Sequence, residues 1–545
     1  MSADGGRPPG RDLAEPSGEG ATELLGALVP RQPSLLERSG PADAGGQLGL
    51  RTGSFRKIAE HGFGDPYNAY PHSMAWFRNR LYVGTTRACL AYRGRWRRER
   101  SPDLLGQVWP VRIPDQLFDI DLRAEIWRYD PASDGWRRVF LSPMAQGIDG
   151  YQVPRMLALR SMTVFQGQSD PAPCLYVPAM GSHQTPDAIM VRSEDGEQFE
   201  VVNEPSMGFP EEYRAKGVRA LTVFGDRLFT APTVGRGRKS PNYTAFMIIG
   251  VNADPARAPW EIACDPNFGD PYNLTVFEMA VFNGYLYAGT ANVREGFQVW
   301  KTDAEGTPPY RWTRVISHGA FRGKFNEGVV TMRAFGGHLY VGSGIQEGGW
   351  DTEHNVGPAA AEVIRLHPDD SWDLVVGQPR MTPDGLKVPL SGLGPGFDNP
   401  FTAYIWSMCE HEGWLYVGTL DTLVLLRYGK PGSWVWPEYL RKQFRAKQLE
   451  EMLLQAGGFN LWRTQDGVQW FPVTRNGFGN CYNYGARTLV SAPCGLFVGA
   501  ANPFGPDVAV KRPHGWRYEP NPDGGLEIWL GSPTARAAAR GELRA

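Results

Sequence analysis

The sequence lacks the features of a membrane protein or a nucleic-acid-binding protein. It contains no run of about 18 consecutive apolar residues, the length that a membrane-spanning helix requires. Neither charge is in clear excess, because 56 Lys and Arg residues stand against 58 Asp and Glu residues, a formal net charge of −2. This balance does not provide the broad basic surface that nucleic-acid binding needs. We therefore predict no membrane span and no nucleic-acid partner.

The chain also has few cysteines and no recognisable metal or cofactor motif. Its 6 cysteines never occur in CxxC spacing, and none stands beside a His at zinc-ligand spacing. The motifs HExxH and GxSxG and a phosphate-binding glycine loop are missing as well. We therefore predict free thiols in a reducing compartment, assign no metal ligand, and leave the cofactor unknown.

The two ends of the chain lack the pattern of a folded segment. Residues 1–50 are polar and rich in Gly and Pro, without the apolar stretch of a secretory signal peptide. We expect a disordered leader over 1–50, a disordered tail over 533–545, and one domain over 51–532. Together with the cysteine usage, this organisation predicts a cytoplasmic protein.

What the sequence does contain is one phrase that recurs along the chain. In most copies an apolar segment ends in Phe, and a short turn and a strand of the form Leu-Tyr/Phe-Val-Gly-Thr follow. The copies begin at Leu81, Leu175, Leu228, Leu286, Leu339, Leu415 and Leu496. A third strand such as AEIWRY and a fourth strand that contains a Trp complete the repeat. Four short strands per repeat are typical of an antiparallel propeller blade, so we predict an all-β, seven-bladed β-propeller.

The last repeat is incomplete, and its missing strand is found at the other end of the chain. The seventh copy stops after its third strand, LEIWLG, whereas SFRKIAEHGFGDPYN from Ser54 matches the fourth-strand phrase FPVTRNGFGNCYN from Phe471. We therefore predict that the N-terminal strand completes the last blade and covers an edge that would otherwise be exposed.

Two hairpin turns resemble a known propeller motif. RTQDGVQW (Arg463 to Trp470) and the weaker RSEDGEQF (Arg192 to Phe199) resemble the Asp-box of sialidase-like (BNR-like) propellers. The resemblance implies a structural turn in which the Asp bonds back to the backbone and the Trp packs between blades. It implies a propeller fold and no particular substrate or functional family.

Four long insertions follow the second strand of their repeats, at 88–123, 345–361, 421–457 and 502–523. In a propeller these loops lie on the same face as the loops that enter the first strands, where ligands usually bind. The insertion of the sixth repeat ends in an amphipathic segment that predicts a helix. We expect the insertions to cap a pocket at the central channel, or to form a rim that binds a protein partner.

The innermost strands supply the candidate site residues. Two positions before the Met or Leu of these strands are His72, Arg160, Arg219, Trp406 and Arg487. Three arginines at one level suit a carboxylate or phosphate, because the guanidinium fork matches both groups. We predict that these arginines and Trp406 bind a ligand and that His72 or Glu278 transfers a proton.

A second candidate set is a ring of amides. Asn68, Asn273, Asn326 and Asn483 each stand six residues before the Met or Leu of a first strand. They are predicted either to cap turns or to line the channel and bind the ligand.

Three functions remain open on the sequence. The first is a propeller that binds, and transforms if catalytic, a small anionic or polar-aromatic molecule under the cap. The second is a non-catalytic protein-interaction scaffold, and the third is a glycan-binding or glycan-cleaving propeller. A glycosidase needs two facing carboxylates, and only Glu278 is placed with confidence, with Asp421 or Glu347 as the candidate partner.

Overall fold

A computed structural model describes residues 49–533 except 101–107, 182–183, 186–187, 203–205, 211–212, 214, 235–246, 352 and 430–445. The chain divides into two units, Met1–Pro41 and Ala42–Ala545, and every described residue belongs to the second unit. The expected leader up to residue 48 and the tail from 534 lie outside the described residues. All six cysteines are free.

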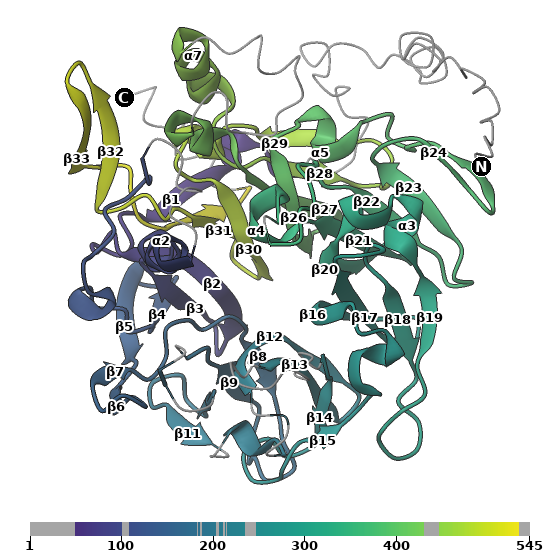
Figure 1. The fold of residues 1–545 in the computed structure, drawn as a ribbon. Helices are drawn as coiled ribbons and strands as arrows, with labels where there is room; N and C mark the ends of the chain where they lie inside the picture. Colours follow the sequence, from purple (N-terminus) through teal and green to yellow (C-terminus); the bar gives the residue numbers. More distant parts are fainter. Residues whose placement is uncertain are drawn as a thin grey trace, which may run out of the picture. The chain divides into compact units, whose positions relative to one another are not determined.

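The second unit is built from successive antiparallel groups of four strands (Figure 1). The first three groups are β2 (Asn68–Phe77), β3 (Arg80–Arg87), β4 (Glu125–Asp130) and β5 (Gly135–Leu141); β8 (Thr163–Phe165), β9 (Cys174–Pro178), β10 (Met190–Ser193) and β11 (Glu200–Val202); and β12 (Ala215–Phe224), β13 (Arg227–Val234), β14 (Gly250–Asn252) and β15 (Glu261–Ile262).

The next three groups are β16 (Asn273–Phe282), β17 (Tyr285–Asn292), β18 (Val299–Thr302) and β19 (Thr313–Ile316); β20 (Gly328–Phe335), β21 (His338–Gly344), β22 (Val363–Leu366) and β23 (Trp372–Val376); and β26 (Thr402–His411), β27 (Trp414–Asp421), β28 (Leu461–Thr464) and β29 (Phe471–Thr474). Each group pairs in chain order, which confirms the predicted four-stranded antiparallel repeat.

The last group joins both ends of the described chain. β30 (Gly485–Ala492) pairs with β31 (Gly495–Ala501), β31 with β34 (Glu527–Gly531), and β34 with β1 (Phe55–Ala59). The register places Phe55 opposite Gly531 and Ala59 opposite Ile528. The buried side chains of Leu50 and Phe55 secure this strand. The predicted completion of the last repeat by the N-terminal strand is therefore confirmed.

The first strands of the groups contact one another in a closed sequence. β2 contacts β8, β8 contacts β12, and the contacts continue through β16, β20 and β26 to β30, which contacts β2 again. This closed order gives a β-propeller-like fold in which the first strands face one another across the middle. Apolar side chains between neighbouring groups form separate core clusters, as expected when each sheet packs against the next.

Three of the four insertions form one apolar cluster above these strands. It joins Leu90 and Val111 from the first insertion, Val424 and Leu453 from the third, and Phe504 from the fourth. The second insertion, which contains α4 (Gln346–Gly349), is tied to the first by an Arg93–Glu347 ion pair of 3.4 Å. The insertions therefore gather together as expected, and we call this assembly the cap.

The secondary structure of the cap differs in part from the prediction. α7 (Ala446–Ala456) is the predicted helix of the third insertion, and its Leu453 is buried whereas Leu454 is 81% exposed. The first insertion begins with α2 (Cys89–Arg100), a helix that the sequence pattern did not predict. A hairpin of β32 (Asp507–Arg512) and β33 (Gly515–Pro520) forms most of the fourth insertion.

Smaller elements lie in the connections. Two further hairpins are β6 (Met144–Gln146) with β7 (Gln152–Pro154) and β24 (Arg380–Thr382) with β25 (Gly385–Lys387), and short helical turns include α3 (His318–Phe321) and α5 (Pro395–Asp398). The two Asp-box-like turns have the same hydrogen bonds: Asp466 accepts from the amides of Val468 and Gln469, and Asp195 accepts from those of Glu197 and Gln198.

Candidate functional site

Register shifts aim one side chain of almost every first strand away from the sheet. In β2 the shift falls between Pro71 and Ser73, so His72 has no partner on β3. The same shift isolates Arg219 with Ala220 in β12, Phe277 in β16, Val330 in β20, Trp406 in β26 and Arg487 in β30. Bulges of this kind re-aim side chains and are common beside functional sites. We call His72, Arg160, Arg219, Phe277, Val330, Trp406 and Arg487 the inner ring.

The glycine of the recurring Leu-Tyr-Val-Gly phrase explains why the bulge recurs. A Cβ on Gly84 would lie 2.6 Å from Ser73 Oγ, and one on Gly499 would lie 2.3 Å from Thr488 Oγ1. These hydroxyls need the space because each donates to the neighbouring group: Ser73 to the carbonyl of Leu159 at 2.7 Å and Thr488 to that of Pro71 at 3.1 Å. The repeat phrase therefore encodes both the bulge and the contact between groups.

The structure brings the three predicted arginines together with His72. The charges of Arg160, Arg219 and Arg487 all act on the imidazole of His72, and Arg160 and Arg487 act on Arg219. Burial lowers the pKa of Arg160 to about 10. Burial and the neighbouring Arg160 lower the pKa of Arg219 to about 9 and that of Arg487 to about 10. All three guanidiniums therefore stay charged at neutral pH but repel one another.

These arginines form no ion pair within 4 Å among the described residues, although the charge of Glu278 acts on Arg487 and that of Glu327 acts on Arg219. The Nε of Arg219 and the Nε of Arg487 are buried without a hydrogen-bond acceptor. Their side chains lie against aromatic rings instead: Arg219 Cζ lies 4.1 Å from the centroid of Phe277, and Arg487 Cζ lies 5.3 Å from that of Trp406. All four side chains remain half-buried, so solvent reaches the ring.

His72 is held as a neutral imidazole. It is buried on β2, and its Nδ1 is hydrogen-bonded to Thr86 Oγ1. Burial, followed by the charges of Arg487, Arg160 and Arg219, keeps the pKa of His72 well below its ordinary value. A neutral imidazole at this position does not add a fourth positive charge to the cluster.

Glu278 is the acid among these residues. It occupies in β16 the position that Ser73 and Thr488 occupy in their strands, directly after the bulge. Its Oε1 accepts the backbone N–H of Met279 at 3.1 Å. Burial raises the pKa of Glu278 to about 7, against the opposing effect of Arg487 and Arg333. The carboxyl therefore exchanges a proton near neutral pH, as a general acid or base must.

A second carboxyl was missed by the sequence analysis. Glu327 directly follows Asn326 at the entry of β20 and is fully buried. Its Oε1 accepts from Gln346 Nε2 at 2.8 Å, whereas its Oε2 has no partner among the described residues. Burial raises its pKa to about 7, and its charge acts on Arg219 and Tyr404. The sequence did show Glu327 as an acidic residue directly after Asn326, which is one of the four recurring asparagines.

The two acids nominated as partners of Glu278 have other contacts. Asp421 is buried at the end of β27, where it accepts from Asn399 Nδ2 at 2.7 Å and from the N–H of Leu423 at 2.8 Å. Glu347 forms its ion pair with Arg93 in the cap. Neither contributes to the electrostatic surroundings of Glu278, where Arg487 and Arg333 are the charged neighbours.

Of the two roles predicted for the four asparagines, their hydrogen bonds match the role of holding the entry turns. The four asparagines are fully buried, with no exposed surface: Asn68, Asn273, Asn326 and Asn483. Each donates one amide hydrogen to a carbonyl of its own entry turn and the other to a Glu or Gln, for example Asn483 to Gly477 O at 3.0 Å and to Glu527 Oε2 at 2.6 Å. Both amide hydrogens of each asparagine are donated within its own four-stranded group, so these side chains stabilise the entry turns and have no donor left for a ligand.

The cap reaches the aromatic side chains around the inner ring. Tyr70, Tyr404 and Tyr484 surround Trp406, with ring centroids 5.8, 5.9 and 6.1 Å from it. All four rings pack against the apolar cluster of the cap. Gly485 allows this approach, because a Cβ there would lie 2.0 Å from Trp406 Cζ3.

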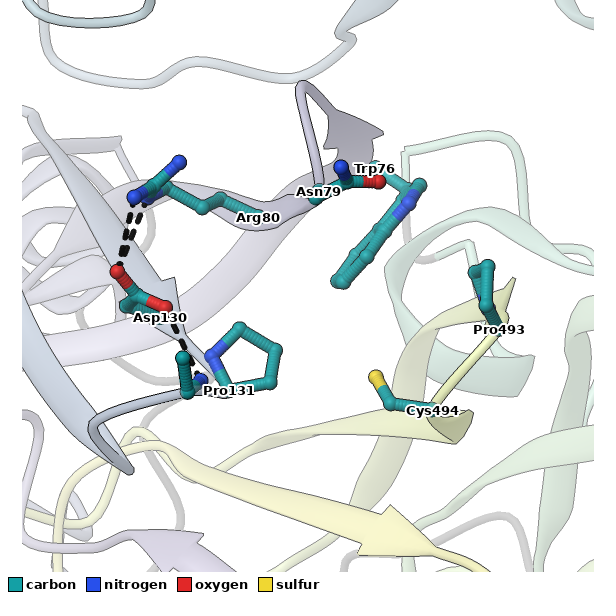
Figure 2. A pocket seen from close by; sticks show the side chains of 8 residues that line it. Trp76, Asn79, Arg80, Asp130, Pro131, Pro493 and Cys494 are labelled. Atoms are coloured by element: carbon teal, nitrogen blue, oxygen red, sulfur yellow. Dashed lines mark hydrogen bonds and ion pairs between the residues drawn. The ribbon is translucent and has the colours of Figure 1, made fainter.

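A surface recess lies at the ends of the strands that face away from the entry loops (Figure 2). It has a volume of about 320 Å³ and is lined mainly by the turns that follow β2, β4 and β30. Its one guanidinium, Arg80, is already paired with Asp130 at 3.0 Å. Its thiol, Cys494, has a pKa raised by burial, which disfavours the reactive thiolate. We therefore place the candidate site at the inner ring.

The described residues contain no group of three or more His, Cys, Asp or Glu side chains arranged to hold a metal ion. No helix in the described part of the chain is long and apolar enough to cross a membrane.

No protein-family model and no curated protein sequence matches this chain. Among solved structures it is similar to a GH43 β-xylosidase/α-arabinofuranosidase from a compost microbial metagenome, with 12% identity and a TM-score of 0.30 over 62% of this chain and 97% of the other. It is also similar to a GH93 α-L-arabinofuranosidase of Fusarium graminearum, with 11% identity and a TM-score of 0.34 over 65% and 88%.

A prolyl endopeptidase matches 94% of this chain at 10% identity with a TM-score of 0.39, and the match spans 54% of that protein. Similarities at this level carry no information about substrate, which in propellers depends on the site rather than on the fold.

Proposed function

We propose that this chain is a seven-bladed β-propeller that binds a small anionic molecule at the inner ring, beneath the cap. The observation that carries the proposal is the cluster of Arg160, Arg219 and Arg487. The charge of Arg160 lowers the pKa of both Arg219 and Arg487, and the Nε–H groups of Arg219 and Arg487 are buried without a hydrogen-bond acceptor among the described residues. Such a cluster is costly without a ligand and becomes favourable when an anion neutralises it.

The surroundings of the cluster support this function. A planar guanidinium can donate two parallel hydrogen bonds to the oxygens of a carboxylate or phosphate. The Nε–H groups of Arg219 and Arg487, which have no acceptor among the described residues, provide further donors. The aromatic residues between the ring and the cap reduce access of water, which strengthens charge interactions. If the bound molecule is transformed, Glu278 is the proposed proton-transfer group, because its carboxyl exchanges a proton near pH 7 whereas His72 stays neutral.

Thermal unfolding in the presence of anions tests the proposal. Inorganic phosphate and citrate, added at constant ionic strength with chloride as the balancing salt, should raise the unfolding temperature of the wild-type chain. Binding at about 100 times Kd adds about 2.7 kcal/mol to stability. The variants Arg160→Met and Arg487→Met should lose this response, and Arg311→Met, which replaces an exposed arginine, should keep it. An unresponsive wild type, or responsive ring variants, would refute the proposal.

Glycan cleavage is the second candidate function. It is favoured by Glu278 and Glu327, two of the three described carboxyls whose pKa is raised to about 7; the third, Asp421, accepts hydrogen bonds at the end of β27. Glu278 lies near Arg487 and Glu327 lies near Arg219, so both carboxyls border the same arginine cluster. A glycosidase uses one protonated and one ionised carboxyl, and a pKa of about 7 permits either state. Release of 4-nitrophenol from a panel of 4-nitrophenyl glycosides should then be lost in both Glu278→Gln and Glu327→Gln. A wild-type chain without activity on the panel would exclude this candidate for the sugars tested.

A further inference from the structure

The inner ring is divided into a cationic part and an apolar part. Following the contacts from β30 to β2 and then through β8 to β12, its residues are Arg487, His72 and Arg219. Arg160 lies three residues before β8, and its charge acts on all three. Following the contacts from β16 through β20 to β26, the residues of the ring are Phe277, Val330 and Trp406. Each part is continuous along the closed sequence of first strands, so the ring has one charged side and one apolar side.

The two parts meet at matching borders. At one border the guanidinium of Arg219 lies over the ring of Phe277, with 4.1 Å between Cζ and the centroid. At the other border Arg487 lies over Trp406, at 5.3 Å. Each pair places a planar cation against the face of an aromatic ring. An anion held by the arginines therefore has an aromatic surface beside it at both ends of the cationic part.

The aromatic surface is extended around Trp406. Tyr70 and Tyr404 meet its indole nearly edge-on, at interplanar angles of 89° and 75°. Edge-to-face contacts of this kind fix the orientation of an aromatic ring. The half-buried state of Phe277 and Trp406 shows that part of each ring stays uncovered.

From this division we infer that the ligand is an aromatic anion, an aryl carboxylate or aryl phosphate. Its charged group lies between Arg160, Arg219 and Arg487, and its ring packs against Phe277 and Trp406. The inference rests on the proposed function, because it assigns the body of the anion that the arginines bind. A wholly polar anion would leave the apolar half of the ring without a contact, and a neutral aromatic molecule would leave the guanidiniums uncompensated.

Paired probes test the inference on the full chain. Dissociation constants are measured for benzoate against acetate and for phenyl phosphate against inorganic phosphate. In each pair the aryl compound should bind about tenfold more tightly, the gain expected from burying and stacking one phenyl ring. The carboxylate and phosphate pairs also distinguish which anionic group the arginines prefer.

Two variants locate the aromatic contact. Phe277→Leu and Trp406→Phe keep an apolar side chain at the ring but alter the stacking surface. Both should reduce the aryl preference, measured as the ratio of the two dissociation constants within each pair of probes. Phe325→Leu, which replaces a phenyl ring that is 42% exposed outside the inner ring, should leave the preference unchanged.

The outcomes separate the two proposals. If phosphate and acetate bind but the aryl compounds bind no more tightly, the aromatic inference is refuted and the anion-binding function stands. If none of the four compounds binds, the anion-binding function fails as well. An aryl preference that survives in both Phe277→Leu and Trp406→Phe would place the ligand ring elsewhere and would overturn the inference.

Discussion

Replacing Arg219 by methionine should stabilise the ligand-free protein and abolish its response to anions. Arg219 has the most strongly lowered pKa of the three arginines, about 9 against the ordinary 12.5. At about 1.4 kcal/mol for each pK unit, this difference corresponds to about 5 kcal/mol of penalty on the charged form. Methionine has a similar reach and no charge, so it removes the penalty and keeps an apolar contact with Phe277.

The net gain is smaller than the full penalty. Arg219 is only half-buried, and solvent screening together with its cation–π contact offsets part of the cost. Replacing buried charges by apolar groups has stabilised other proteins by about 1–4 kcal/mol, so we expect a gain of roughly 1–3 kcal/mol. For a unit of this size, about 1 kcal/mol shifts the unfolding temperature by about 1 °C. The variant should unfold about 1–3 °C above the wild type in phosphate-free buffer.

The pH dependence follows from the direction of the shift. A base whose folded-state pKa is lowered destabilises the fold at every pH below that value, and the penalty disappears only as the pH rises from about 9 towards 12.5. The difference between variant and wild type should therefore be constant between pH 6 and 8. Differential scanning fluorimetry with Arg311→Met as the control measures it. A variant less stable than the wild type that still responds to phosphate would refute the reasoning.

Three further predictions concern the other residues of the site and the closure. The wild type should lose stability as the pH rises from about 4.5 to about 7, because the raised pKa of Glu278 keeps its carboxyl protonated longer in the folded state, and Glu278→Gln should remove this loss. The difference in unfolding free energy should reach roughly 3 kcal/mol at most above pH 7. Parallel stability–pH curves for variant and wild type would contradict this prediction. Asn483→Ala should destabilise the protein by about 2–4 kcal/mol, because Glu527 loses a buried hydrogen-bond donor. Phosphate affinity, measured by calorimetry, should not change; a loss of affinity without a loss of stability would support a ligand-binding role for Asn483. Phe55→Ala should cost about 3–5 kcal/mol and expose β34 to limited proteolysis, because the buried side chain of Phe55 anchors the closing strand β1. Unchanged stability and digestion would argue against the closure.

The repeat and its closure follow from local patterns in the sequence. The recurring phrase marks a buried second strand, and Gly84, Gly418 and Gly499 each leave room for a hydroxyl from the adjacent strand. The copies from Leu175 and Leu228 have Pro178 and Ala231 in place of the glycine. The match between the segments at Ser54 and Phe471 likewise predicted that β1 would pair with β34. The repeat also gave the equivalent positions in the first strands, two residues before the Met or Leu, that are occupied by His72, Arg160, Arg219 and Arg487.

The hydrogen-bond partners and charge interactions of these residues depend on the tertiary fold. The asparagines and the arginines occur at equally regular spacings. The asparagines donate to Glu and Gln side chains next to the third strand of their own group, whereas Arg219 and Arg487 each keep a buried Nε–H without an acceptor among the described residues. Glu327 shows the same limit, because its burial and its effect on Arg219 depend on residues far apart in sequence. Hydrogen-bond satisfaction and charge compensation are properties of side chains from several strands at once, so spacing within one strand cannot reveal them.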